Sequence, residues 1–350
     1  MVRIMWCQDT PPIRCTPMVS TMDAAMTYQA IFRRVFLALL VLPAGLVGQE
    51  AGTSERLLEV GNVEREYVLH LPQGYKKSQK KTFPLVVMLH GLMGTGRMAS
   101  RRYGWKPLAD KEGFVAVFPT AIGTPTRWKA GWRATRDSKF LAALIEAMIK
   151  EFSVDKDRVY MTGHSSGGFM SFSFAATHPD KVAAIGNVAG LMIGVGKKPK
   201  MPVSVISFHG MRDNVVAYDK EHGKKARWGR GMMSAPKCVA VFARFNGCKK
   251  KPVRTQIGGW VSGEHIEIVA HLDTWTDGDR GTRVEFYSII KGGHGWPRSR
   301  GGRRTIAATP LIWKFFMEHG RKSGSEKAEQ KHKARQKKAE SQAAKKGPSR

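Results

Sequence analysis

Apolar runs of strand length recur along the chain, separated by turn residues and by longer amphipathic segments. A continuous run of about four to eight apolar residues indicates a fully buried strand, and strict alternation indicates a strand with one exposed face. By these criteria the sequence predicts strands over residues 64–71, 83–89, 113–119, 159–164, 182–189, 203–208 and 284–290.

Segments with apolar residues at helical spacing lie between these runs. The segment SKFLAALIEAMIKEF begins after Asp137, which is the expected N-cap, and a second helix is expected over residues 235–245. Strands that alternate with helices predict an α/β fold with a doubly wound, mostly parallel sheet and helices on both faces. Such sheets bind ligands at the carboxyl ends of their strands.

The stretch 159–175 combines a strand, a glycine turn and a helix. Its pentapeptide GHSSG at 163–167 matches G-x-S-x-G, the pattern of a nucleophile elbow, in which small neighbours allow a serine to occupy a sharp turn. Ser165 is therefore the candidate nucleophile. The N–H of Ser166 and the N–H of Leu92, just past an earlier strand, are the candidate oxyanion donors. The pattern alone also arises by chance in a chain with 37 glycines.

An acid and a histidine follow the serine in the order that such hydrolases use. Asp213 comes just after the run 203–208, where a carboxylate can fix the tautomer of a histidine. His294 lies in the glycine-rich loop after the run 284–290 and is the candidate base. We expect loop packing or substrate contact from the other histidines at strand ends, which are His90, His164 and His209.

Six motifs between residues 85 and 316 are specific when they are taken together, within a resemblance that runs from about residue 64 to residue 319. They are LVVMLHG at 85–91, DSKFLAALI at 137–145, VDKDRVYMTGHSSGG at 154–168, FHGMRDNVVAY at 208–218, GGHGWP at 292–297 and TPLIWKFF at 309–316. The chain thereby resembles the secreted α/β-hydrolase esterases that include polyhydroxybutyrate depolymerases, feruloyl esterases and acetyl xylan esterases. The resemblance implies an α/β-hydrolase fold, a Ser165–His294–Asp213 triad, and oxyanion donors at Leu92 and Ser166.

The substrate pocket is less well defined by this resemblance. Trp296 is implied to line an acyl or aromatic pocket, and His164 and Trp132 are expected as further substrate contacts. The family often has paired aspartates where this chain has Arg136-Asp137, and the loop 121–135 is strongly basic and lacks cysteines. The ester therefore stays open between a polymeric hydroxyalkanoate, a feruloyl-sugar and an acetyl-sugar.

The expected activity is hydrolysis of carboxylic esters through an acyl-enzyme, with no metal or organic cofactor. No Cys/His cluster has zinc-ligand spacing. Two alternatives stay open. A serine peptidase on the same fold would be favoured by an appended propeller, and a non-catalytic binding protein on the same scaffold is disfavoured by the intact serine, acid and histidine.

Charge and length bear on the two ends of the chain. The 350 residues are 42% hydrophobic and carry a net charge of +30. This charge indicates contact with anionic polymers or surfaces, or merely a basic proteome. Residues 321–350 hold 11 Lys or Arg against three Glu and predict a disordered basic tail, either a tether to an anionic polymer or an idle extension. No signature of specific nucleic-acid binding occurs.

Near the N-terminus, a basic FRR at 32–34 precedes the apolar VFLALLVLPAGLVG at 35–48. This pattern predicts a signal peptide cleaved near Gly48 or Ala51, and the run is too short for a stable membrane span. The protein is then secreted or periplasmic; an uncleaved anchor is the alternative, and a start at Met26 would give a signal of ordinary length.

The expected organisation is an N-terminal extension with its signal over 1–51, a catalytic domain over 52–320 and the tail over 321–350. Two of the four cysteines, Cys238 and Cys248, would remain after export. A disulfide between them is expected, with two separate thiols as the alternative.

Overall fold

The computed structural model describes residues 51–76, 81–219, 232–260, 266–298 and 306–321. The predicted signal segment and all of the basic tail except Arg321 lie outside these described residues. No described helix is long and apolar enough to cross a membrane.

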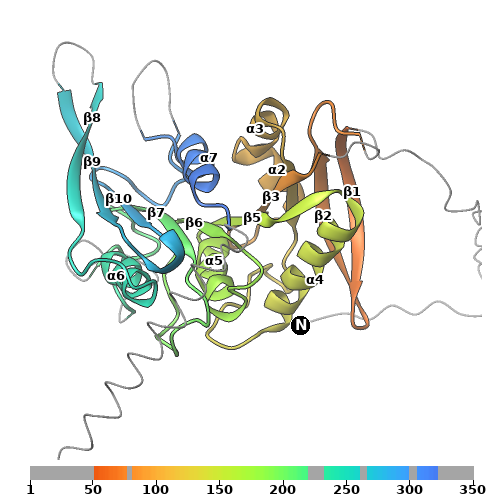
Figure 1. Ribbon diagram of the computed structural model, residues 1–350, viewed down its shortest axis with the longest axis horizontal. Helices are drawn as coiled ribbons and strands as arrows, with labels where there is room; N and C mark the ends of the chain where they lie inside the picture. Colours follow the sequence, from red (N-terminus) through yellow and green to blue (C-terminus); the bar gives the residue numbers. More distant parts are fainter. Residues whose placement is uncertain (1–50, 77–80, 220–231, 261–265, 299–305, 322–350) are drawn as a thin grey trace, which may run out of the picture. The chain divides into compact units, whose positions relative to one another are not determined.

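One sheet of ten strands organises the described domain (Figure 1), in the order β1-β2-β4-β3-β5-β6-β7-β10-β9-β8. The strands are β1 Gly52–Val60, β2 Val63–Leu71, β3 Phe83–Leu89, β4 Val115–Pro119, β5 Val154–His164, β6 Ala184–Val188, β7 Ser204–Gly210, β8 Val253–Trp260, β9 Ile266–Trp275 and β10 Val284–Ile289. The six central strands from β4 to β10 are parallel, and β1, β2, β9 and β8 join the two edges antiparallel.

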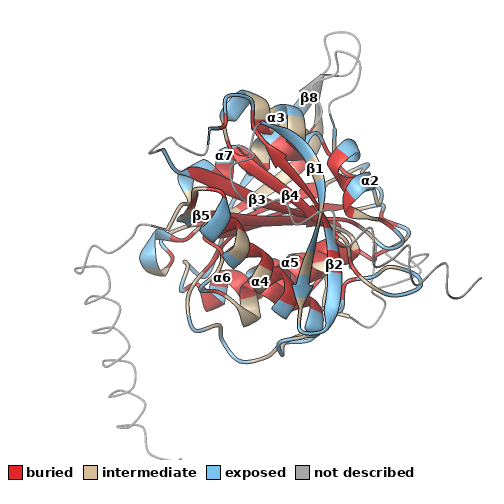
Figure 2. Ribbon diagram, turned by 90° about the vertical axis from the view of Figure 1, so that its right-hand side faces the viewer, coloured by how far each residue is buried: buried red, intermediate tan, exposed pale blue. Residues whose placement is uncertain are grey.

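Helices cover both faces of this sheet (Figure 2). They are α2 Gly96–Arg102, α3 Trp105–Glu112, α4 Arg136–Glu151, α5 Ser166–Thr177, α6 Ala235–Phe245 and α7 Ala308–Glu318. Helices α4, α5 and α6 pack on one face, and α2, α3 and α7 pack on the other. The doubly wound, mostly parallel arrangement expected from the sequence is confirmed.

The apolar runs are explained by burial on both faces. In β3, Leu85, Val87 and Leu89 face the core under α4 to α6, whereas Val86 and Met88 face the core under α2, α3 and α7. Side chains of a strand alternate between faces, so a strand covered on both sides must be apolar at every position.

All seven strands predicted from the apolar runs are present, with ends that shift by a few residues, and the helix over 235–245 has the predicted bounds. The predictions missed β1, β8, β9, α2, α3 and α7. The edge strands β1 and β8 are partly exposed and carry polar residues, so they lack the continuous apolar run of a central strand.

The expected N-cap of α4 was wrong. Thr135 caps the helix, because its side chain accepts a hydrogen bond from the N–H of Ser138, and Asp137 lies inside the first turn. The buried Asp137 instead accepts a hydrogen bond from Arg65 of β2 at 2.9 Å and one from the N–H of Lys129 at 2.8 Å. This carboxylate therefore joins β2, α4 and the basic loop.

The expected disulfide is also absent, since Cys238 and Cys248 are free thiols. Cys238 is buried on α6, where its sulfur accepts a hydrogen bond from the N–H of Met192 at 3.3 Å. Cys248 lies beyond the end of that helix, beside Gly278. The two sulfurs therefore face different neighbours, and burial raises the pKa of both thiols to about 11.

Candidate active site

The turn after β5 holds Ser165 in a backbone conformation that few residues adopt, with φ 53° and ψ −117°. A Cβ on Gly163 would lie 2.3 Å from the carbonyl of Gly167, and a Cβ on Gly167 would lie 2.4 Å from the carbonyl oxygen of Leu89. A side chain at either position would therefore force the backbone of the turn to shift. The N–H of Ser165 donates to the carbonyl of Val188 at 2.8 Å, which fixes the turn against β6.

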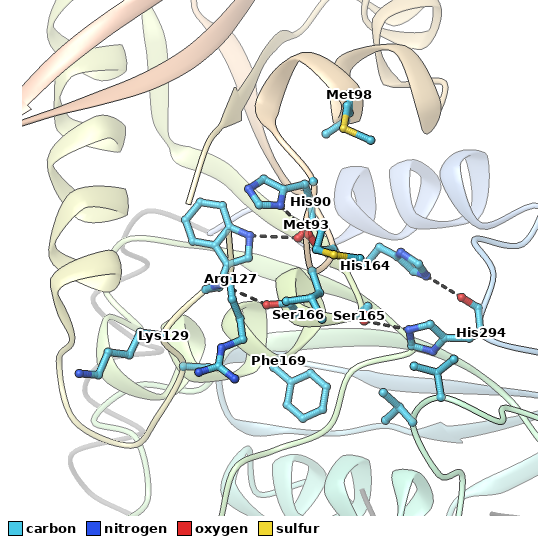
Figure 3. Close-up of a pocket in the computed structure, with 18 of the residues that line it drawn as sticks. His90, Met93, Met98, Arg127, Lys129, His164, Ser165, Ser166, Phe169 and His294 are labelled. Atoms are coloured by element: carbon cyan, nitrogen blue, oxygen red, sulfur yellow. Dashed lines mark hydrogen bonds between the residues drawn. The ribbon is translucent and has the colours of Figure 1, made fainter. Parts of the chain in front are cut away.

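A continuous chain of hydrogen bonds starts at this serine. The Oγ of Ser165 lies 2.8 Å from Nε2 of His294, as Figure 3 shows, and Nδ1 of His294 lies 2.7 Å from Oδ2 of Asp213. Because the carboxylate can only accept, Nδ1 carries the proton and Nε2 is free to accept the serine hydrogen. The three residues follow β5, β7 and β10, so the carboxyl ends of parallel strands bring them together as expected.

Hydrogen bonds to both of its oxygens hold the carboxylate of Asp213 in place. Its Oδ1 accepts the N–H groups of Val215 and Val216, both at 2.8 Å. Burial by itself would raise the pKa of this carboxyl, but hydrogen bonds from His209 and His294 outweigh burial and hold the pKa well below its usual range. His209 therefore supports the same carboxylate oxygen that His294 contacts, since its Nε2 lies 3.4 Å from Oδ2.

His164 contacts the backbone of His294 rather than its ring nitrogens. Its Nε2 donates to the carbonyl oxygen of His294 at 2.9 Å (Figure 3). Its Nδ1 lies 3.3 Å from the hydroxyl of Tyr103. Burial, together with the neighbouring His294, lowers the pKa of His164 to about 4. The neutral ring therefore orients the loop that carries His294, and it also lines the cavity described below.

Trp296 does not line a substrate pocket, which corrects the expectation. Its side chain is buried, its Nε1 donates to Oγ1 of Thr309 at 3.0 Å, and its ring packs on Tyr103 with centroids 4.7 Å apart. It thus packs against Tyr103, which in turn contacts His164. Trp132 also lies away from the large cavity, because it packs against Phe245 and Gly196 and borders a much smaller hollow.

The loop after β3 lies directly against the elbow, since a Cβ on Gly91 would be 3.6 Å from the Cβ of Ser165. The carbonyl of Gly91 accepts hydrogen bonds from Nδ1 of His90 at 2.7 Å and from the N–H of Gly94 at 3.0 Å. His90 has its proton on Nδ1, because its Nε2 accepts the N–H of Ala121. These bonds fix the peptide plane whose opposite side carries the Leu92 N–H.

The second candidate donor follows from helix geometry. Ser166 is the first residue of α5, so its N–H has no partner within the helix. The side chain of Ser166 is buried and its Oγ accepts the N–H of Trp128 at 3.2 Å. Leu92 and Ser166 both border the same cavity as Ser165.

A cavity of about 830 Å³ opens above Ser165 and His294. Its described lining is mainly apolar, with Leu92, Met98, Phe169, Ile193 and Val216 around the serine, and Figure 3 shows Phe169 below Ser166. The sequence analysis missed Tyr103, Phe169 and the α2 contribution to this lining, because nothing in a local pattern marks a residue from another element as a neighbour. Among the described residues, no cluster of His, Cys, Asp and Glu is arranged to bind a metal ion.

Comparisons with known proteins found similarity to esterases. A family model described as esterase PHB depolymerase matches residues 65–234. Feruloyl esterase C of Emericella nidulans is 27% identical over 72% of this chain and 84% of its own length, and feruloyl esterase D of Neurospora crassa is 24% identical over 73% and 83%.

A bifunctional acetylxylan esterase/xylanase of Neocallimastix patriciarum is 31% identical over 140 residues, and the chain spans only 21% of its length. The solved acetyl xylan esterase of Aspergillus awamori shares the fold, with a TM-score of 0.53 and 15% identity over 75% of this chain and 99% of the other.

The class of protein follows from these findings. The sheet, the elbow and the structural likeness define an α/β hydrolase. Within that class the chain is a carboxylic ester hydrolase, and its resemblance to the esterases that include polyhydroxybutyrate depolymerases, feruloyl esterases and acetyl xylan esterases is confirmed.

Proposed function

We propose that the chain is an exported serine esterase that uses Ser165 as nucleophile, His294 as general base and acid, and Asp213 as the group that orients His294. The observation that carries this proposal is the unbroken hydrogen-bonded chain, with 2.8 Å between Ser165 and His294 and 2.7 Å between His294 and Asp213. Export rests on the predicted signal within residues 1–51, and the catalytic domain is assigned to 52–320.

The steps follow from the roles of these atoms. Nε2 of His294 takes the proton of Ser165 while Oγ attacks the ester carbonyl, and the same nitrogen then protonates the leaving alcohol. The N–H groups of Leu92 and Ser166 stabilise the tetrahedral oxyanion, and each such donor contributes about 3 kcal/mol. Water repeats the sequence on the acyl-enzyme and frees the acid.

The substrate is proposed to be a feruloyl- or acetyl-polysaccharide ester, with a polyhydroxyalkanoate as the second candidate. A mainly apolar cavity of about 830 Å³ has room for an aromatic acyl group as well as for acetate. Relatives named as feruloyl esterases and as an acetylxylan esterase support the first two. Initial rates on methyl ferulate, acetylated xylan and a polyhydroxybutyrate film separate the three.

The nucleophile is tested by Ser165→Ala. We expect loss of hydrolysis of 4-nitrophenyl acetate with an unchanged thermal unfolding midpoint, because the hydroxyl reacts and does not pack. A fluorophosphonate probe followed by peptide mapping should label Ser165 alone. Labelling of another serine, or activity retained by the variant, would contradict the assignment.

A further inference from the structure

The cavity above Ser165 has an unbalanced charge. Arg102, Arg127 and Lys129 belong to its described lining, which contains no Asp or Glu. All three side chains are exposed, and none of them takes part in an ion pair with another described residue. Positive charges at one cavity raise the local concentration of anions, and they do so most where no carboxylate neutralises them.

Two of these cations stand on a backbone that is held in place. Arg127 and Lys129 flank Trp128, whose N–H donates to Oγ of Ser166 at 3.2 Å and whose indole N–H donates to the carbonyl of His90 at 3.0 Å. Figure 3 shows these bonds and places Arg127 and Lys129 on the side of the cavity opposite His294.

The next residue is anchored as well. The N–H of Lys129 donates to Oδ2 of Asp137 at 2.8 Å, and this buried carboxylate is paired with Arg65. Residues 128 and 129 therefore have three buried hydrogen-bond partners. These are His90 after β3, Ser166 at the start of α5 and Asp137 in α4. The backbone that carries these cations is therefore already ordered. When an anion binds, only the cationic side chains lose conformational entropy.

We propose that the cavity selects esters that carry a carboxylate in addition to the scissile ester, with Arg127 and Lys129 as the specificity-determining cations and Arg102 as a third. The apolar lining around Phe169 and Ile193 accepts the carbon skeleton, and the cations at the rim pair with the carboxylate. This inference rests on the proposed esterase function and names the substrate class of the same site. It also gives a role to the basic loop 121–135.

Two matched pairs of small esters test the inference on either side of the scissile bond. One pair is methyl 4-carboxycinnamate and methyl 4-carbamoylcinnamate, and the other is 4-acetoxybenzoate and 4-acetoxybenzamide. In each pair the carboxamide is neutral and has nearly the same shape as the carboxylate. The measured quantity is the ratio of kcat/KM for the charged ester to kcat/KM for its neutral partner. Rates of alkaline hydrolysis without enzyme correct this ratio for intrinsic reactivity.

In at least one pair we expect kcat/KM for the charged ester to exceed that for the neutral ester about threefold or more at low salt. An effect of this size is what a few exposed ion pairs contribute together. The preference should shrink when the ionic strength is raised to about 0.5 M, because exposed charges are then screened. The double variant Arg127→Gln, Lys129→Gln should lose most of it. Arg133 is an exposed cation of the same loop that lies outside the cavity lining. Arg133→Gln is therefore the matched control and should keep the preference for the charged ester.

The outcomes are distinct. Equal kcat/KM for charged and neutral esters in both pairs, or a preference that survives in the folded double variant, would overturn the inference while the esterase function stands. Failure of the wild-type protein to hydrolyse any of the four esters would contradict the proposed function, and the inference would fall with it. Circular dichroism and thermal unfolding confirm that the double variant is folded.

Discussion

At the scale of single residues, hydrogen bonds to the backbone hold both Ser165 and the loop that carries His294. Ser165 is held at φ 53°, a conformation that costs about 1–3 kcal/mol for a non-glycine residue. The loop that carries His294 is held by the N–H of His164, whose other nitrogen lies beside Tyr103. His164 is therefore proposed to act on the reaction through the position of His294.

A pair of substitutions tests this positioning role. His164→Leu removes the N–H that holds the His294 carbonyl, and we expect kcat to fall by about 10²-fold, since small displacements of a base are costly, with little change in KM. The amide nitrogen of His164→Gln reaches the place of Nε2 and should recover much of kcat. Equal losses in the two variants would contradict a role that depends on this hydrogen bond.

The same residue predicts a dependence of stability on pH. The pKa of His164 is about 4 in the folded protein against about 6.5 in an unfolded chain. Between these values the unfolded state binds more protons, so stability is lost as the pH falls, by up to about 3 kcal/mol at pH 4. Urea unfolding at pH 7 and pH 4 should show a smaller loss for His164→Gln, and an equal loss would refute the assignment.

At the scale of elements, the junction of β3, β5 and α5 depends on close backbone contact. A Cβ at Gly167 would meet the carbonyl oxygens of Leu89 at 2.4 Å and His90 at 2.8 Å, and neither backbone can move without disturbing the loop after β3. The helix start and the loop therefore cannot be adjusted independently.

Gly167→Ala is expected to lower the free energy of unfolding by about 1–3 kcal/mol, the usual cost of forcing extra volume into a packed site, and to reduce kcat sharply. Gly131→Ala is the matched control, because a Cβ there meets nothing within 4 Å. Thermal and urea unfolding together with esterase rates measure both effects. A Gly167→Ala variant as stable and active as the control would show that the junction yields more easily than the contacts indicate.

At the scale of the whole molecule, the two ends of the chain should be separable from the chemistry. Strand β1 begins at Gly52 and pairs along its length with β2. We expect the mature N-terminus of exported protein to lie between about Gly48 and Thr53, as a short apolar segment followed by small residues implies. N-terminal sequencing checks this, and an exported chain that still begins at Met1 would refute it.

The boundary of the basic tail needs a correction of one residue. The sequence places Arg321 in the disordered tail. In the structure its N–H donates to the carbonyl of Asp157 at 2.7 Å, and its guanidinium donates to the carbonyls of Pro179, Asp180 and Val182. This residue is therefore the last anchor of the described domain.

Deletion of residues 322–350 should leave both the turnover of a small soluble ester and the thermal unfolding midpoint nearly unchanged. Deletion of residues 321–350 should lower the unfolding midpoint, because it also removes the hydrogen bonds of Arg321. If the tail is a tether, the first deletion weakens binding to an anionic polymer, and the loss shrinks as salt rises because charges are screened beyond about 10 Å at 0.1 M. Retention on a heparin column at two salt concentrations measures this. A large loss of turnover in the first deletion would show that the tail packs on the domain.

The sequence by itself determined the central sheet and the candidate nucleophile, acid and base. Buried parallel strands require continuous apolar runs, and strand ends place the following residue at one edge of the sheet. Ser165, Asp213 and His294 could therefore be named from the G-x-S-x-G motif, their order in the chain and their positions after strands, together with the family resemblance. Only the tertiary structure decided what long-range contacts determine. Asp137 pairs with Arg65 instead of capping α4, Trp296 supports Tyr103, and the cations of the basic loop stand at the cavity. Each of these depends on residues far apart in the chain, and a local pattern carries no information about which distant element comes to lie beside it.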